Sequence, residues 1–107
     1  MITNVSPEQH AKLHAILTYA VRAAMVFRRE GAKPCLIFMD WPESKAKPEI
    51  AACHAAGYKP AGVVALTLSG QLVCEAVDRE SEPDVIDARN EFGCVLCAEA
   101  CAPAAVN

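Results

Sequence analysis

The chain has 107 residues, of which 53% are hydrophobic and 21% charged, and this balance predicts one globular domain over residues 1–107. Its formal net charge of −3 argues against a general affinity for nucleic acid, which depends on a cationic surface. No segment reaches the roughly 18 consecutive apolar residues that span a bilayer, so we expect no membrane partner.

The first predicted element is a long helix that begins near Ser6 and ends at Gly31. Ser6-Pro7-Glu8-Gln9 combines a hydroxyl cap with proline at the first helical position. Apolar residues then recur at spacings of four and three, which places on one stripe Leu13, Leu17, Ala20, Ala24 and Phe27. A helix of about 24 residues is long for so small a domain, and its overhang favours a partner helix.

A buried strand is the next predicted element. Residues Cys35–Met39, with the sequence CLIFM, form a continuous apolar run, which predicts a strand buried on both faces and central in its sheet. Residues 44–57 predict a second helix, which starts near Pro48 and stops at Gly57.

Residues 62–77 predict a hairpin, because two strand-like runs flank the turn residues Ser69-Gly70. The last predicted helix begins at Ser81, again with a capping sequence and a proline in its first turn. We expect this helix to end near Pro103 and the tail, residues 103–107, to fray.

These elements predict an α/β fold of the α+β-like, two-layer kind, in the order α-β-α-β-β-α. The strand at 35–39, the second helix and the first hairpin strand would form a right-handed parallel crossover. The other hairpin strand pairs antiparallel. We therefore expect a small mixed sheet of three strands covered by helices, with the long helix at the N-terminus.

Three of the six cysteines lie in the last predicted helix, at Cys94, Cys97 and Cys101. At about 100° per residue they fall opposite the apolar stripe centred on Phe92, and so we expect them to point away from the sheet. Thiolates at i, i+3 and i+7 are also a ligand pattern for zinc or an iron–sulfur cluster. In a regular helix, however, residues seven apart are separated by about 10.5 Å, too far for one ion with zinc–sulfur bonds of about 2.3 Å.

Two other interpretations of these cysteines remain open. A redox pair of Cys94 and Cys97 needs a lowered thiol pKa, which a helix N-terminus supplies and a helix interior does not. Alternatively, the cysteines serve as small, soft apolar residues in an alanine-rich packing surface.

The charges are distributed unevenly along the chain. Residues 1–60 hold eight Lys/Arg and five Asp/Glu, whereas residues 61–107 hold two and eight. The basic stretch consists of Arg22, Arg28, Arg29 and Lys33. Ordinary solvated faces and an acidic helix start explain this pattern, and the alternative is an acidic face for a basic partner or a second copy.

Candidate binding residues follow the buried strand and line the basic stretch. Asp40 and Trp41 end the strand at 35–39, where ligand sites in α/β sheets tend to lie. Asp40 is a candidate acid or base there, or it caps the turn while Trp41 covers the core. Arg22 and Arg29 complete the predicted binding set.

We therefore expect a small, non-catalytic binding or regulatory module that acts through protein–protein contacts as a homodimer, without a cofactor. A heterologous protein partner is the alternative to self-association. The amino terminus lacks a basic start followed by an apolar run, and thiols stay reduced inside cells, so we expect a cytoplasmic protein.

Two further hypotheses belong to other classes. One is a zinc, iron–sulfur or redox protein that uses Cys94, Cys97 and Cys101. The other is a small-ligand or enzymatic site near Asp40 and Trp41.

Overall fold

The computed structural model describes residues 7–101 and confirms the α/β class. The order of its elements is α-β-β-α-β-β-α, one strand more than predicted. The elements are α1 (Pro7–Thr18), β1 (Ala20–Arg28), β2 (Cys35–Phe38), α2 (Glu43–Ala55), β3 (Lys59–Thr67), β4 (Leu72–Ala76) and α3 (Glu82–Cys101). The predicted frayed tail lies outside the described residues.

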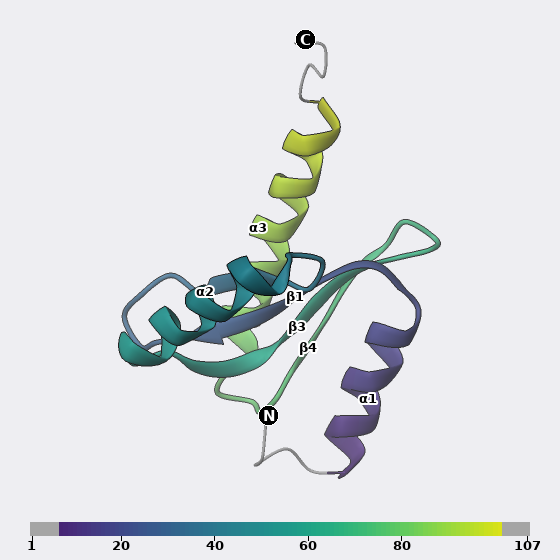
Figure 1. Ribbon diagram of the computed structural model, residues 1–107. Coiled ribbons are helices and arrows are strands. Elements are labelled where there is room, and N and C mark those ends of the chain that lie inside the picture. Colours follow the sequence, from purple (N-terminus) through teal and green to yellow (C-terminus); the bar gives the residue numbers. More distant parts are fainter. Residues whose placement is uncertain (1–6, 102–107) are drawn as a thin grey trace, which may run out of the picture.

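The sheet has four strands in the order β2-β1-β3-β4, and every neighbouring pair is antiparallel (Figure 1). The prediction of a mixed, three-stranded sheet is therefore wrong. Strands β2 and β3 do run in the same direction, as the predicted crossover requires, because β1 is antiparallel to both. They do not pair, since β1 lies between them.

The missing strand is the second half of the predicted N-terminal helix. The helix ends at Thr18, and residues 20–28 form β1, which pairs on both sides. Ala24 and Phe27, predicted to share one helical stripe, lie in separate cores on the two sides of the sheet. Pairing with two strands and the β propensity of Val21, Val26 and Phe27 outweigh the helix-like spacing.

Irregular pairing explains why the alternation of a strand is hard to recognise in β1. The register shifts between Ala20 and Arg22 and again between Val26 and Phe27. Each shift breaks the period of two that a regular strand shows. The sequence AVRAAMVFR therefore lacks the clean apolar–polar alternation by which a strand is predicted.

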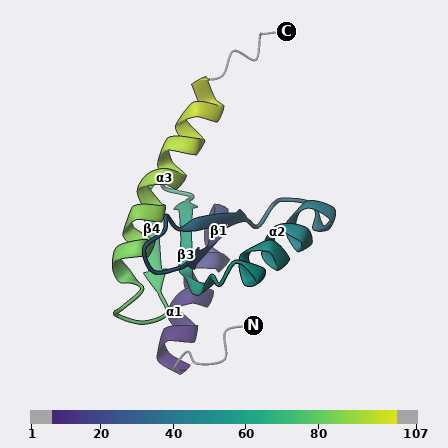
Figure 2. The same ribbon diagram turned by 90° about the vertical axis from the view of Figure 1, so that its left-hand side faces the viewer.

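Helices cover both faces of this sheet, as Figure 2 shows for α2 and α3. α3 covers one face with Val85, Ala88 and Phe92, which are all fully or almost fully buried. α2 covers the other face through Cys53, which packs against Phe27 and Ile37 of the sheet. α1 contacts β3 and β4.

The lengths of the helices also differ from the prediction. α3 has 20 residues and α1 only 12, so the long helix is C-terminal and not N-terminal. The second helix starts at Glu43, before the predicted Pro48. Within the described part of the chain, no helix is both long and apolar enough to cross a membrane.

The hairpin is confirmed, with a longer connection than predicted. Residues 68–71 join β3 to β4, and Gly70 has a positive φ of 87°. Strand β2 differs more from its prediction, because it forms an edge of the sheet and not its centre.

Close packing of α3 on β3 depends on Gly62. A Cβ atom at this position would overlap the carbonyl oxygen of Glu75, and it would lie 2.9 Å from the Cα of Ala76 and 3.0 Å from Cγ2 of Val85. Two of these neighbours are backbone atoms of β4, which cannot rotate away. Only glycine fits between the paired strand and the helix above it.

We expect Gly62→Ala to lower the free energy of unfolding by about 3 kcal/mol, because it overpacks a buried site. Gly31→Ala is the control: its φ of 79° is strained for alanine, but nothing lies within 4 Å of the added Cβ. We expect that control to lose about 1 kcal/mol. Urea unfolding of both variants measures the difference, and equal losses would contradict the close approach at Gly62.

Candidate functional site

The two sides of α3 have different environments, as predicted. Val85, Ala88 and Phe92 are buried against the sheet, and Val95 and Leu96 pack partly against the same core. The three cysteines lie on the other side and are exposed: Cys94, Cys97 and Cys101. The helix is continuous through Cys101, so the thiols follow a regular helical spacing.

The C-terminal part of α3 rises clear of the rest of the molecule (Figures 1 and 2). All of residues 97–101 are exposed, and we call them the α3 arm. Four of these residues are small and apolar, namely Cys97, Ala98, Ala100 and Cys101. The fifth is Glu99, the one charged residue of the arm.

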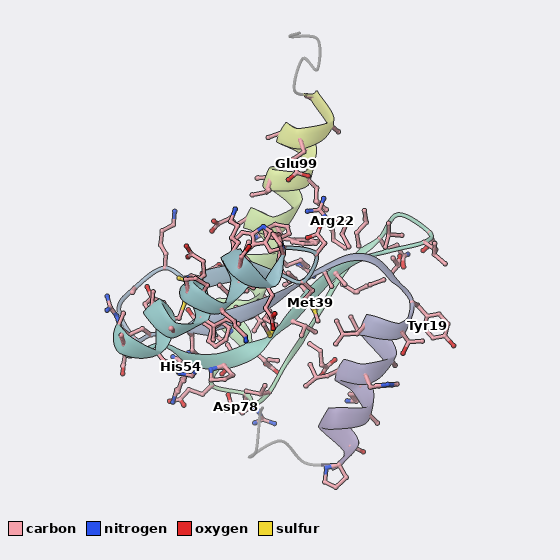
Figure 3. All side chains as sticks on the ribbon, in the orientation of Figure 1. Tyr19, Arg22, Met39, His54, Asp78 and Glu99 are labelled. Atoms are coloured by element: carbon pink, nitrogen blue, oxygen red, sulfur yellow. The ribbon has the colours of Figure 1, made fainter. Side chains whose placement is uncertain are left out.

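Arg22 connects the arm to the sheet. Its Nη1 donates a hydrogen bond of 2.9 Å to Oε1 of Glu99, and Figure 3 shows the two side chains side by side. Its Nε lies 3.2 Å from Oδ2 of Asp40, a charge contact without the geometry of a hydrogen bond. Both carboxylates are more than half exposed, so each pair contributes about 0–1 kcal/mol and serves mainly to orient the groups.

Arg22 also contacts a cluster of aromatic rings. Its guanidinium lies 5.2 Å from the centre of the Phe38 ring. Phe38 stacks on Phe92 of α3 at a centroid distance of 5.4 Å and contacts Trp41 at 5.8 Å. The Nζ of Lys45 covers the outer face of Trp41 at 4.1 Å from the ring centroid.

Three of the four predicted binding residues therefore come together. Arg22 contacts Asp40 directly, and Trp41 reaches the same cluster through Phe38. Trp41 also packs against both hydrophobic cores, which matches the alternative in which it covers the core.

Arg29, the fourth predicted binding residue, lies elsewhere. Its Nη1 donates a hydrogen bond of 2.9 Å to the carbonyl oxygen of Ala56, just after the end of α2, and its guanidinium lies 5.0 Å from the Tyr58 ring centroid. A cation at the C-terminal end of a helix satisfies a free carbonyl. These contacts give Arg29 a structural role.

Sequence reasoning missed two partners of Arg22, whereas a third, Asp40, belongs to the predicted binding set. Glu99 and Phe38 lie 77 and 16 positions away in the chain, and neither was singled out. The sequence offers one indication of the first partner: Glu99 is an isolated acid near the end of the last helix, where no capping pattern explains it.

The basic stretch contacts acidic residues from the second half of the chain. Nε of Arg28 donates a 2.6 Å hydrogen bond to Oδ2 of Asp84, and its Nη1 lies 3.9 Å from Glu80. The hydrogen bond with Asp84 raises the pKa of Arg28 above its ordinary value. Part of the charge imbalance seen in the sequence is thus neutralised internally.

An open groove of about 740 Å³ lies between the loop that follows β1 and α3. Its walls contain three carboxylates, one cation and one thiol, contributed by Asp84, Asp87, Glu91, Lys33 and Cys94. Because Asp84 is already bound to Arg28, Asp87 and Glu91 supply the remaining negative charge of the groove.

The positions of the exposed cysteines bear on the metal-site hypothesis. Within residues 7–101, no three or more His, Cys, Asp or Glu side chains are grouped so that they could hold a metal ion. The regular helix keeps Cys94 and Cys101 about 10.5 Å apart along its axis, as expected for seven residues. All six cysteines are free thiols.

Two further thiols lie on the face of the sheet opposite α3. Cys53 of α2 is buried beside Cys35 of β2. Burial, together with the neighbouring Cys35 thiol, raises the pKa of Cys53 to about 11. Burial also raises the pKa of Cys74, although nearby Arg89 opposes the shift.

Comparisons of the chain with protein-family models, curated proteins and solved structures found no match.

We expect Asp84→Asn to lower the free energy of unfolding by about 2 kcal/mol, because the 11% exposed side chain of Arg28 then loses its carboxylate partner. Replacing both residues, as Arg28→Met with Asp84→Leu, should cost less than Asp84→Asn alone. Glu82→Gln removes an exposed acid from the same helical turn and controls for the helix dipole. Chemical unfolding gives all three values, and equal losses for Asp84→Asn and Glu82→Gln would contradict a specific ion pair.

We expect Cys53 to resist alkylation in the folded protein, because only the thiolate is nucleophilic and a pKa of about 11 leaves almost none at pH 7. Exposed Cys94 in the same sample is the internal control. Labelling with iodoacetamide, followed by peptide mass spectrometry, measures both rates. The rate at Cys53 should rise about tenfold per pH unit up to its pKa while the fold persists. Equal rates at pH 7 would contradict the raised pKa.

Proposed function

We propose that this chain is a non-catalytic binding or regulatory module that acts through protein–protein contacts as a homodimer. The observation that carries the proposal is the α3 arm, which presents four small apolar side chains to solvent on a projecting helix. Alanine and cysteine on a helix surface permit a second helix to approach closely. An uncovered helix of this composition is typical of a contact surface.

The charges of the arm favour a second copy of the chain as its partner. Glu99 is the arm's one charged residue, and it is bound back to Arg22 of the same chain. Two identical arms can therefore meet without strong repulsion between like charges. Held in this way by Arg22, the arm also loses less conformational freedom when it binds.

We further propose a cytoplasmic location. The support is the state of the cysteines, since all six are free thiols. Free thiols persist in reducing compartments, whereas exported domains of this size commonly pair them as disulfides.

The mass of the full chain in solution tests the homodimer. We expect sedimentation to give twice the chain mass of 11.4 kDa at micromolar concentration. Ala98→Glu places an unpaired carboxylate in the contact and should raise the dimer Kd roughly tenfold or more. Ala52→Glu makes the same change at an exposed position of α2 and should leave the Kd unchanged.

Two outcomes would contradict this function. A mass of 11.4 kDa at every concentration would remove the homodimer. Elemental analysis of the same sample separates the alternative class: a stoichiometric metal that is lost in Cys97→Ser would favour a metalloprotein over a binding module.

A further inference from the structure

Strand β2 has the composition of an inner strand but lies at an edge of the sheet. Its four residues, Cys35 to Phe38, are all apolar and contain no charge, proline or bulge. Edge strands in natural proteins usually carry such features because they prevent unwanted pairing. A continuous apolar run is typical of a strand whose two faces are both buried. Here α3 and α2 cover the two faces of β2, so the observation that calls for a neighbour is the unprotected outer edge.

The outer backbone groups of β2 can be identified from its pairing with β1. The amide of Met39 donates to the carbonyl oxygen of Ala23, and Ile37 pairs with Met25 in the same register. In an antiparallel pair, hydrogen-bonded residues alternate with residues whose N–H and C=O point outward. Leu36 and Phe38 therefore direct their backbone groups to the open edge. Among the described residues, one of these groups has a local partner, the Phe38 carbonyl, which accepts from Trp41.

We propose that β2 pairs antiparallel with β2 of a second copy, so that two four-stranded sheets join into one of eight strands. The proposal rests on the proposed homodimer and names a surface for it that is separate from the α3 arm. Antiparallel self-pairing is two-fold symmetric, as a closed dimer requires.

Pro34 selects the register of this pairing. Pairing Leu36 with Leu36 of the second copy would place Pro34 opposite Phe38, where the ladder needs an N–H that proline lacks. Pairing Leu36 with Phe38 of the second copy avoids this loss. It centres the two-fold axis on Ile37 and forms about four intermolecular backbone hydrogen bonds.

The chemistry at the strand ends agrees with this register. Lys33 precedes β2 and Asp40 follows it, so antiparallel pairing brings the cationic end of one strand beside the anionic end of the other. Met39, which is 49% exposed in the single chain, comes to lie opposite Cys35 of the second copy. Both ends of the strand thus gain a complementary neighbour.

The α3 arms lie at opposite ends of this dimer. α3 runs in the same direction as β2, because its first turn binds Arg28 beside the start of β2 and Glu99 binds Arg22 beside its end. The two-fold axis of an antiparallel strand pair is perpendicular to the sheet, so it leaves both α3 helices on the same face but reverses the direction in which the second arm projects. The arms therefore do not contact each other in this dimer, and β2 is a surface separate from them.

A matched pair of variants tests the strand pairing. Leu36→Pro removes an outward N–H and no hydrogen bond within the chain, and by symmetry it deletes two of the four bonds between copies. Leu36→Ala keeps the N–H and trims the same side chain. We expect sedimentation equilibrium to give Leu36→Pro a dimer Kd roughly thirtyfold above that of Leu36→Ala.

A cross-link tests the register without relying on the proline variant. In the proposed pairing, Met39 and Cys35 of the second copy form a non-hydrogen-bonded pair with a Cα separation of about 4.5 Å, within the range for a disulfide. Met39→Cys, with alanine at Cys53, Cys94, Cys97 and Cys101, should give a disulfide-linked dimer under mild oxidation. Leu68→Cys in the same background, at a residue 82% exposed, should not.

The outcomes separate the two proposals. Equal dimer Kd values for Leu36→Pro and Leu36→Ala, or a Met39→Cys dimer without the link to Cys35, would overturn the β2 pairing while a dimeric wild type still supports the proposed function. In that case a dimer held by the arms alone remains. A wild type that stays monomeric would overturn both.

Discussion

The whole structure depends on the placement of residues 20–28 as a strand paired on both sides. β1 bonds to β2 along one edge and to β3 along the other, so it satisfies its backbone within the sheet. Its side chains contribute to both hydrophobic cores, Ala24 and Val26 beneath α3 and Phe27 beneath α2. Without this strand, β2 and the β3–β4 hairpin would share no hydrogen bonds. Neither α2 nor α3 would then have a continuous sheet surface to cover.

The same strand positions α3 at both of its ends. Arg28, at the end of β1, binds Asp84 in the first turn of the helix, and Arg22, near the start of β1, binds Glu99 in its last turns. Arg22 also lies near the C-terminal end of α3, where a cation complements the helix dipole. The two ion pairs orient a helix whose central residue, Phe92, is fully buried between them. The direction in which the α3 arm projects is therefore determined by β1.

The sequence predicts the elements that have one dominant local pattern. α3 was predicted with its buried and exposed sides, because Val85, Phe92 and Leu96 repeat at helical spacing and Cys97 does not share their side. β1 was missed since its alanines mimic a helical stripe and its register shifts hide the period of two. The cluster of Arg22, Asp40 and Trp41 was predicted as separate candidates, and its assembly depends on pairing between distant segments that no local pattern contains.

The two edges of the sheet show where local and global information disagree. β4, the last strand in the sheet order, carries a charged residue, Glu75, between Cys74 and Ala76, which pack in the core beneath α3. A charged residue is common in a strand at a sheet boundary. β2 has no such residue, although it occupies the opposite boundary. Natural sequences are usually consistent from local pattern to global fold, and inconsistencies concentrate at functional surfaces. The uncharged outer edge of β2 is the inconsistency on which the proposed pairing rests, since the covering of its two faces by α3 and α2 explains its apolar side chains but not its open backbone groups.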